Sequence, residues 1–476
     1  MAESTGGLRT PRTPVHSGVV WYPLPALQSA PRLLEVAVMT LRVTVVGTGY
    51  VGLVTGVCLA HSGHSVTCVD IDRAKVELLS SGTSTIYEPG IEELLASGME
   101  SGNLTFSTPE NGWRDLIGDI TVVAVGTPMA ANGAADLSAV RAVVAALAEA
   151  ADRPFTLVMK STVPMGTGAA LRQRYLDDAS VRIGYVSNPE FLREGKALED
   201  WFKTDRIVLG AAEETDLALM RELYADIDAP LVETDVASAE TIKYASNAFL
   251  STKISFVNEI ANLCDCIGAD IDAISRGIGM DKRIGSQFLN AGIGYGGSCF
   301  PKDTRALDFI ATLNGYQFTL LKSVIEVNNR QRLLPVVHVM RALPDLHERS
   351  IAILGLAFKP DTDDVRESPA LDIVPLLAEQ GAAIRIYDPV AAELAVPGAA
   401  RVADVWQALE GASAAVVVTE WDEFTELDWA RVRAVMTGPG IIFDGRNCLD
   451  ANAVRSAGLT YMAVGRDGEH RAAENA

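Results

Sequence analysis

The feature that most constrains the fold of this chain is a glycine-rich turn between a strand and a helix. Residues 41–46 (LRVTVV) form a β-branched run typical of a buried parallel strand, and residues 47–52 (GTGYVG) follow it directly. In this setting Gly47 permits a tight turn, Gly49 lets a pyrophosphate approach the backbone, and Gly52 lets helix and strand pack closely. The phosphates would lie at the helix N-terminus, where free N–H groups favour anions. The pattern therefore predicts a dinucleotide-binding fold.

Polar residues at the ends of later strands extend this prediction. The strand at 65–69 ends at Asp70, where a carboxylate suits the ribose 2′-OH of NAD and repels the 2′-phosphate of NADP. Two further apolar strands lead to Thr127 and Thr162. Because ligands in open α/β sheets bind beyond the carboxyl ends of strands, both threonines are candidate site residues, although each also suits a helix cap or a turn. The sequence thus predicts NAD as the cofactor.

Composition narrows the class of protein. The chain has 476 residues and 48% hydrophobic content, which predicts two or three globular domains. No apolar run approaches the length of a membrane span, and a formal net charge of −21 argues against a nucleic-acid or anionic-membrane partner. The six cysteines lack paired metal-ligand spacing, so we expect reduced thiols in a cytoplasmic enzyme without a metal site. An anionic substrate would need local cations.

The order of the patterns predicts the domain limits. Residues 1–40 are basic and rich in proline, and we expect a disordered extension or a start codon placed too early, with a transit peptide as the alternative. The remainder predicts an NAD-binding doubly wound domain, a central helical and dimerisation domain that carries Cys299, a second doubly wound domain and a tail. Their expected limits are 41–237, 238–345, 346–465 and 466–476.

The central segment has the apolar spacing of helices from about Ser238 onward. Lys243 and Asn247 lie one turn apart there, so they share one face of a helix. Taken alone, the pair fits a solvated polar stripe better than a binding site. A second long helical stretch, residues 319–340, contains Pro335 and would connect this segment to the next domain. Exposed apolar positions on such helices often form dimer surfaces.

The C-terminal third returns to alternating strands and helices, which predicts a second doubly wound unit. Its first strand runs into residues 355–359 (GLAFK), a weakened fingerprint that keeps one glycine and adds a lysine. Lys359 could meet a nucleotide phosphate there in place of bare N–H groups. Arg366 and Arg446 follow at comparable edges and supply the cations that an acidic chain needs to hold an anion.

A cysteine in an unusual setting lies between the two units. Cys299 stands in residues 294–303 (GYGGSCFPKD), where glycines leave room for a ligand, Lys302 could favour the thiolate and Asp303 could transfer protons. For an arbitrary cysteine, ordinary packing is the more frequent explanation. Residues 187–195 (SNPEFLREG) follow another strand end and hold two carboxylates around an arginine, which suits either a site or a solvated helix start with an ion pair.

These motifs together resemble the UDP-glucose/GDP-mannose dehydrogenase family over residues 39–460, and residues 299–303 (CFPKD) are most similar to its UDP-glucose 6-dehydrogenases. The resemblance implies oxidation of UDP-glucose to UDP-glucuronate with two NAD⁺ and one water, through a thiohemiacetal and a thioester. GDP-mannose or a UDP-N-acetylhexosamine is the alternative substrate. A two-electron dehydrogenase and a catalytically inactive nucleotide-sugar sensor are more distant alternatives.

The resemblance also assigns roles by motif. Cys299 would be the nucleophile, Asp303 and Lys243 would handle protons and the alkoxide, Asn247 would hold the oxyanion, Glu194 would be the base for thioester hydrolysis and Thr162 would position water. Arg283 would reach the site of a neighbouring subunit in a homodimer or larger homo-oligomer. The implied NAD contacts are Gly47, Gly49, Tyr50, Val51, Gly52, Asp70, Lys75, Thr127, Thr162, Glu194, Lys302 and Arg366. The implied substrate contacts are Glu190, Phe191, Leu192, Arg193, Glu194, Lys243, Asn247, Arg283, Phe288, Leu289, Asn290, Ala291, Gly292, Gly296, Lys359 and Arg446.

Overall fold

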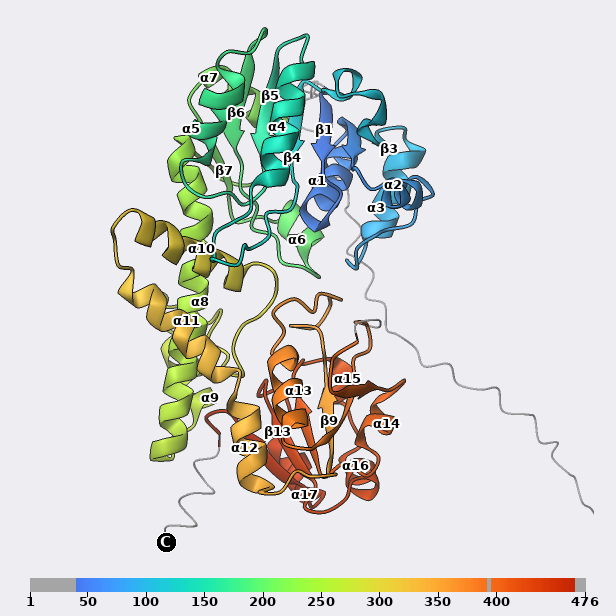
Figure 1. The fold of residues 1–476 in the computed structure, drawn as a ribbon, viewed down its shortest axis with the longest axis vertical. Helices are drawn as coiled ribbons and strands as arrows, with labels where there is room; N and C mark the ends of the chain where they lie inside the picture. Colours follow the sequence, from blue (N-terminus) through green and yellow to red (C-terminus); the bar gives the residue numbers. More distant parts are fainter. Residues whose placement is uncertain (1–39, 392–394, 467–476) are drawn as a thin grey trace, which may run out of the picture. The chain divides into compact units, whose positions relative to one another are not determined.

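The computed structural model describes residues 40–391 and 395–466. The extension predicted at 1–40 and the tail predicted at 466–476 therefore lie outside the described residues, apart from Thr40 and Arg466. Figure 1 shows two regions in which strands alternate with helices, and a set of mainly helical elements between them in the chain.

The first region is built on an eight-stranded sheet of order β3-β2-β1-β4-β5-β6-β7-β8, in which only the β6–β7 pair is antiparallel. Its strands are β1 (Arg42–Val46), β2 (Ser65–Val69), β3 (Leu104–Ser107), β4 (Ile120–Val123), β5 (Phe155–Met159), β6 (Ile183–Ser187), β7 (Ile207–Ala211) and β8 (Leu231–Thr234). Its α-helices are α1 (Tyr50–His61), α2 (Arg73–Ser80), α3 (Ile91–Glu100), α4 (Ser138–Ala150), α5 (Thr167–Leu171), α6 (Ala197–Phe202) and α7 (Glu214–Leu223). Short helical turns are η1 (Pro109–Asn111), η2 (Arg114–Leu116) and η3 (Arg172–Leu176).

The central region begins with the longest described helix, α8 (Val236–Ile267). Asp235 caps its N-terminus by accepting from Ser238 N, and Gly268 ends it in the left-handed conformation. The helices that follow are α9 (Ile271–Gly279), α10 (Phe300–Leu313), α11 (Thr319–Gln331) and α12 (Leu334–Ala342). The single helix predicted at 319–340 is wrong, because Pro335 lacks an N–H group and lies in the first turn of a separate helix, α12.

The C-terminal region has a fully parallel six-stranded sheet of order β11-β10-β9-β12-β13-β14. Its strands are β9 (Ser350–Leu354), β10 (Ala383–Tyr387), β11 (Ala399–Arg401), β12 (Ala414–Val417), β13 (Ile441–Asp444) and β14 (Thr460–Ala463). Its helices are α13 (Ala370–Glu379), α14 (Val405–Leu409), α15 (Asp422–Thr425), α16 (Trp429–Val435) and α17 (Ala451–Ser456).

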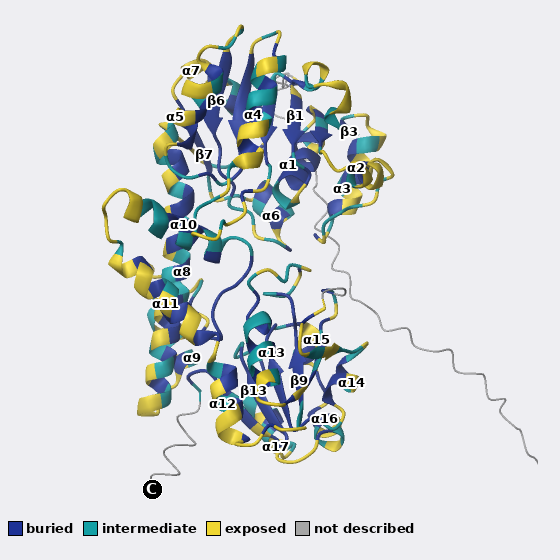
Figure 2. Ribbon diagram, viewed as in Figure 1, coloured by how far each residue is buried: buried dark blue, intermediate teal, exposed yellow. Residues whose placement is uncertain are grey.

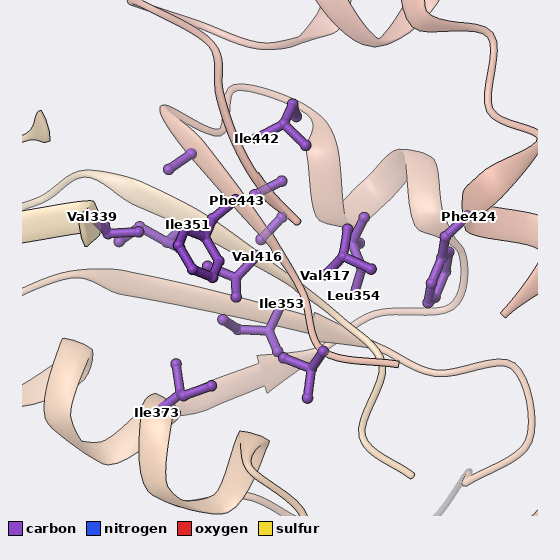
Figure 3. Packing of buried hydrophobic residues seen from close by; sticks show 14 of the residues in the cluster. Val339, Ile351, Ile353, Leu354, Ile373, Val416, Val417, Phe424, Ile442 and Phe443 are labelled. Atoms are coloured by element: carbon purple, nitrogen blue, oxygen red, sulfur yellow. The ribbon is translucent and has the colours of Figure 1, made fainter. Parts of the chain in front are cut away.

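Apolar strand residues form the cores of both sheets. Figure 2 shows most of the central strands as buried and much of the outward helix surface as exposed. In the C-terminal core, Ile351, Val416 and Phe443 come from neighbouring strands, and Val339 of α12 belongs to the same cluster (Figure 3). This packing attaches the last central helix to the second sheet.

The predicted fold class, two doubly wound units and a central helical region, is confirmed. Among the described residues, no helix is both long and apolar enough to span a membrane. Within the same ranges, no cluster of three or more histidine, cysteine or acidic side chains could hold a metal ion.

Candidate active site

The glycines of the first turn have distinct geometric roles. Gly47 has φ +98°, and a side-chain carbon there would lie 2.7 Å from the carbonyl oxygen of Ala124. At Gly52 such a carbon would lie 1.8 Å from the carbonyl oxygen of Gly47. At Gly49, which begins α1, it would meet no atom within 4 Å. The chain therefore leaves open space beside the helix N-terminus, as binding of a dinucleotide pyrophosphate requires.

Asp70 lies half-buried at the end of β2, next to this turn. Its Oδ2 accepts hydrogen bonds from Thr48 N at 2.8 Å and Thr48 Oγ1 at 2.7 Å, and its Oδ1 accepts from Asp72 N at 3.0 Å. Burial opposes ionisation, but these hydrogen bonds and the charge of Lys75 hold the pKa of Asp70 below its ordinary value. The carboxylate is therefore ionised and can accept from a ribose hydroxyl.

The other strand ends that we predicted as NAD contacts lie close together. Thr127 Oγ1 donates to the carbonyl oxygen of Thr162 at 3.0 Å, so the residues after β4 and β5 are adjacent.

Tyr50, in the first turn of α1, accepts a hydrogen bond from Gly195 N at its phenolic oxygen, at 2.8 Å. The fingerprint helix therefore contacts the segment that holds Glu194.

Cys299 lies directly before α10, and its side chain is partly buried. Its Sγ is 3.5 Å from Ser298 Oγ. Burial raises the pKa of the Cys299 thiol to about 11, although the ammonium group of Lys243 opposes the shift. The ligand-free protein therefore holds a protonated thiol at neutral pH, and its activation needs a proton acceptor.

The glycines before Cys299 allow close contact with the C-terminal domain rather than open space. A side-chain carbon at Gly296 would lie 2.3 Å from the carbonyl oxygen of Glu367. At Gly297, where φ is +80°, it would lie 2.8 Å from the ring of Phe358. The loop thus brings the thiol against the C-terminal domain.

Lys243 and Asn247 are both buried, so the solvated stripe that their spacing alone favoured is wrong. Lys243 Nζ is 2.8 Å from Glu190 Oε1 and 2.8 Å from the Glu190 carbonyl oxygen. Burial alone lowers the pKa of Lys243, but the charges of Glu190 and Asp303 help to raise it above its ordinary value. This lysine is therefore a cation held beside the thiol.

Asp303 connects Asn247 to Lys302. Its Oδ2 accepts from Asn247 Nδ2 at 2.6 Å, and its Oδ1 accepts from Lys302 Nζ at 2.5 Å. Lys243 and Asn247 lie on one face, as predicted, but in this structure they bind different carboxylates rather than one shared oxygen. Reaching a substrate oxygen together would require them to exchange or share these partners.

Three residues of the C-terminal domain contact Glu194. Its carboxylate accepts from Thr362 Oγ1 at 3.2 Å and lies 3.7 Å from Arg366 Nη2, and its carbonyl oxygen accepts from Lys359 Nζ at 2.6 Å. Burial and the nearby Asp364 raise the pKa of Glu194 to about 7. A carboxylate with such a pKa suits a general base at neutral pH.

Arg193 does not pair with the glutamates on either side of it. It forms a bidentate ion pair with Asp200, with N–O distances of 2.5 and 2.9 Å. Residues 190–196 are not helical either, since α6 begins only at Ala197. The helix start with a local ion pair, one of the two explanations for this segment, is therefore wrong.

The remaining predicted substrate residues have mixed surroundings. In the 288–292 segment, Leu289 and Ala291 are buried whereas Asn290 is exposed. Arg446 donates to the carbonyl oxygens of Val418, Gly294 and Phe358 at 2.6, 3.0 and 2.9 Å. It therefore joins three backbone segments, and only its remaining N–H groups can bind a ligand. Arg283 is exposed and pairs with Asp281 two residues away, and no contact in the described part of the chain joins it to Cys299.

Sequence patterns missed several groups that support this site. Glu88 is buried and accepts from the backbone N–H groups of Gly195, Ala197 and Leu198, at 2.7, 2.7 and 3.3 Å, and from the hydroxyl of Tyr50. It therefore fixes the segment that carries Glu194. The only local signal was a carboxylate before Pro89 and Gly90, which usually marks a turn. Ser298, Thr362 and Asp364 were missed in the same way, since their partners are distant in the sequence.

Comparison with known proteins gives matches over most of the chain. Residues 41–228 match the NAD binding domain of the UDP-glucose/GDP-mannose dehydrogenase family, residues 237–330 match its central domain, and residues 352–451 match its UDP binding domain. The first of these matches confirms the cofactor predicted from the glycine fingerprint.

Individual relatives extend the match. The chain is 46% identical over 433 residues to UDP-glucose 6-dehydrogenase YwqF of Bacillus subtilis, covering 90% of this chain and 98% of the relative. It is 43% identical over 438 residues to a UDP-glucose 6-dehydrogenase of Rhizobium meliloti, covering 90% and 100%. Among solved structures, a UDP-glucose dehydrogenase from Pyrobaculum islandicum aligns with a TM-score of 0.83 and 37% identity over 90% of this chain and 99% of that one. A UDP-D-ManNAc dehydrogenase from Pyrococcus horikoshii aligns with a TM-score of 0.81 and 27% identity over 90% and 100%.

Proposed function

This chain belongs to the UDP-glucose/GDP-mannose dehydrogenase family, and on that premise we propose that it oxidises UDP-glucose to UDP-glucuronate through a covalent intermediate on Cys299. The observation that carries the proposal is the buried group of Lys243, Asn247 and Asp303 around a half-buried thiol. The space at Gly49 and the ionised Asp70 fit NAD, which when bound accepts one hydride in each oxidation.

The first oxidation turns the C6 alcohol of the sugar into an aldehyde. Lys243 stabilises negative charge on the C6 oxygen, and the hydroxyl proton leaves to Asp303, directly or through a water. The Cys299 sulfur then bonds to the aldehyde carbon while the protonated Asp303 gives its proton to the aldehyde oxygen and takes the proton of the thiol, which forms a thiohemiacetal. Lys243 and Asn247 hold the oxygen of this adduct.

The second oxidation removes hydride from the thiohemiacetal carbon while the hydroxyl proton leaves to solvent through Asp303, and a thioester remains on Cys299. Water, oriented by Thr162 and deprotonated by Glu194, adds to the thioester carbonyl, and the carbon–sulfur bond breaks to release the carboxylate and the thiol. In total, one alcohol, two NAD⁺ and one water give one carboxylate, two NADH and three protons. The pKa of Glu194, about 7, supports its role as the base.

The nucleotide part of the substrate is assigned to the cations of the C-terminal domain. Lys359 donates to the carbonyl oxygen of Glu194, so a phosphate bound by Lys359 would lie next to the proposed base, whereas Arg366 stays assigned to NAD. Residues 288–292 and Gly296 would line the uridine and sugar. We extend the proposal to the domain limits 41–237, 238–345 and 346–465 and to a cytoplasmic location, which the free state of all six cysteines supports.

We further propose a homodimer formed through the central helices. Phe249, Phe256 and Leu263 are exposed at heptad spacing along α8, which gives this long helix an uncovered apolar stripe. The exposed Arg283 would then reach the site of the neighbouring subunit. Sedimentation analysis at several protein concentrations tests the assembly, and a protein that stays monomeric at assay concentration contradicts it.

The deciding assay compares UDP-glucose, GDP-mannose and UDP-N-acetylmannosamine as substrates and counts NADH per sugar consumed. We expect turnover with UDP-glucose and two NADH per molecule. Turnover only with another nucleotide sugar would assign the chain to a different branch of the family, and one NADH per sugar would exclude the thioester pathway.

Cys299→Ser tests the covalent step. We expect uronate formation to fall by about 1000-fold or more, because an alcohol is a far weaker nucleophile toward the aldehyde, while NAD affinity stays unchanged. Cys266→Ser, at an exposed cysteine of α8, is the matched control and should keep full activity. Near-normal uronate production by the Cys299 variant would refute the mechanism.

A further inference from the structure

A small cavity beside residues 188–192 is lined by polar groups that the proposed reaction does not use. Its volume is about 40 Å³. A water needs roughly 10–15 Å³ on this measure, so about three waters or one small carboxylate fit. The hydrogen-bond donors that line it include Lys160 at the end of β5, Trp201 in α6 and Arg206 just before β7.

Lys160 is a buried cation without a carboxylate partner. Its side chain is 4% exposed, and its Nζ donates to Asn188 Oδ1 at 3.1 Å and to Tyr224 Oη at 3.3 Å. An ammonium group has three N–H donors, so one has no acceptor in the described part of the chain. No described acidic side chain lies within ion-pair distance of it, although buried lysines are usually paired.

Two more donors at this cavity are not paired with an acidic group. The indole Nε1 of Trp201 is buried and has no hydrogen-bond partner among the described residues, and the Lys160 ammonium lies 5.3 Å from the centre of its ring. The guanidinium of Arg206 stacks on Phe191 at 3.9 Å and contacts the hydroxyl of Ser246 at 3.4 Å. A buried N–H group without an acceptor is unfavourable unless a ligand or water completes it.

The acidic residues that line the same cavity already have partners. Glu190 binds Lys243, and Asp200 binds Arg193. The cavity is therefore locally cationic in a chain whose formal net charge is −21. We propose that this cavity is a binding site for a small carboxylate anion of the size of formate or acetate, held by the ammonium group of Lys160 beside the ring of Trp201. One carboxylate oxygen would accept a hydrogen bond from the third N–H group of Lys160.

The position of the cavity connects it to the active-site segment. Residues 188–192 line it, and Glu190 in that segment binds Lys243 through Oε1 and through its carbonyl oxygen. A bound anion would therefore contact the segment that carries Glu190. The site itself does not depend on the proposed reaction, and binding can be measured without a substrate.

Binding should depend on pH through Lys160. Burial lowers the pKa of Lys160 to about 8, although the charge of Glu190 opposes the shift. A carboxylate pairs with the protonated amine, so affinity should be highest below pH 8 and fall as pH rises above it. The other charged or titratable groups around the amine or the cavity are Glu190, Lys243, Cys58, Asp200, Arg206 and Tyr224.

Indole NMR of the intact protein tests the proposal at the site itself. The chain has six tryptophans, so ¹⁵N-tryptophan labelling gives one indole resonance for each of them. The resonance that disappears in Trp201→Phe is that of Trp201. We expect the Trp201 resonance to move saturably with sodium formate, and with acetate, at constant ionic strength. The resonances of Trp406 and Trp429, far from the lining, should not move.

Two lysine variants provide the matched comparison. Lys160→Met should weaken formate binding at least tenfold, whereas Lys203→Met, at an exposed lysine just after α6, should leave it within twofold. An unmoved Trp201 resonance up to about 0.1 M formate, or equal binding by Lys160→Met, would overturn the proposal. If Lys160→Met does not fold, as its other indole resonances would reveal, the pH titration of the unaltered protein decides. Binding that persists unchanged well above pH 8 would then refute the role of Lys160.

Discussion

The two doubly wound domains share one scaffold but differ at the turn after their first strand. Both sheets have the same strand order, which is β3-β2-β1-β4-β5-β6 in the first and β11-β10-β9-β12-β13-β14 in the second. Each first strand ends in a left-handed glycine, Gly47 with φ +98° and Gly355 with φ +104°. Each glycine donates its N–H to the last residue of the adjacent strand. The backbone turn is therefore the same in the two domains.

The carboxylates that follow the second strands have different surroundings. Asp70 accepts from Thr48 and Asp72 and keeps part of its surface exposed. Asp388 is 3% exposed and accepts from five N–H groups, those of Leu356, Ala357, Val390, Ala391 and the indole of Trp421. The first carboxylate is available to a ribose, whereas the second is fully occupied in holding its own loop.

The third position of the turn differs as well. Gly49 leaves open space before α1, whereas the C-terminal domain has Ala357 there, whose N–H is bound to Asp388. The N–H of the second turn residue binds the carboxylate in both domains, but only in the C-terminal domain does the carboxylate also occupy the N–H of the third residue, Ala357. The same turn therefore makes a dinucleotide site in one domain and, in the other, a loop whose N–H groups are bound by its own carboxylate. In the second domain, the proposed phosphate contact is therefore the side chain of Lys359.

Among the substitutions that test this difference between the domains, Asp388→Asn should lower the free energy of unfolding the most. The amide keeps the shape but loses charge and acceptor capacity, so at least two buried N–H groups lose their partner. We expect the free energy of unfolding to fall by about 3 kcal/mol or more. Denaturant unfolding followed by circular dichroism measures the change.

Asp70→Asn is the matched control for that substitution. Because Asp70 is half-buried and holds fewer donors, its loss should cost less than about 1 kcal/mol of stability while weakening NAD binding about tenfold. Equal destabilisation by the two substitutions would show that the domains do not differ in the way argued above.

Gly49→Ala should separate cofactor binding from stability. The new methyl group meets no protein atom within 4 Å, so we expect a change of under about 0.5 kcal/mol in unfolding free energy. It occupies the approach of the pyrophosphate, so NAD affinity should fall at least about tenfold, as measured by calorimetry. Ala357→Gly, the reciprocal change, should leave NAD affinity unaltered. Unchanged NAD binding by the Gly49 variant would show that the pyrophosphate does not use this turn.

Much of this scaffold was predictable from local patterns. Short β-branched strands ending in Gly47 and Gly355 fixed both doubly wound units, because strand burial and turn geometry depend on neighbouring residues. The break at Pro335 was not foreseen, although proline in a helical stretch usually begins a new helix. The five donors of Asp388 could not be predicted, since Trp421 comes from another strand end and reaches it only in the folded sheet.

Less of the active site than of the scaffold could be predicted from the sequence. Helical spacing placed Lys243 and Asn247 on one face, but it could not indicate that both are buried or that Glu190 and Asp303 are their partners. The ion pair Lys243–Glu190 and the hydrogen bond Asn247–Asp303 join segments that are distant in the sequence, and no periodic signal marks them. Glu88 is the extreme case, a carboxylate in a turn whose three backbone donors lie on another segment.

The smallest predicted effect concerns Glu194, a residue of the first domain whose pKa is shifted by burial and by charged residues of the second domain. Burial and Asp364 raise the pKa of Glu194 to about 7, while Arg366 and Lys359 oppose the shift. If the carboxylate is the base for thioester hydrolysis, the rate of that step needs the deprotonated form and should rise with pH through about 7. Single-turnover release of the uronate from the acylated protein, measured between about pH 5 and 9, reports this limb.

The variant Asp364→Asn tests whether the second domain contributes to this rise of the hydrolysis rate with pH. Removing the neighbouring negative charge also releases Arg366 from its 2.8 Å ion pair with Asp364, and both changes favour ionised Glu194. The rising limb should therefore move to lower pH by about one unit, with little change in its plateau. Asp363→Asn, at the adjacent acidic residue, should leave the limb in place. A limb that is unmoved in the Asp364 variant would mean that the second domain does not set the acidity of the base, and that burial in the first domain alone accounts for it.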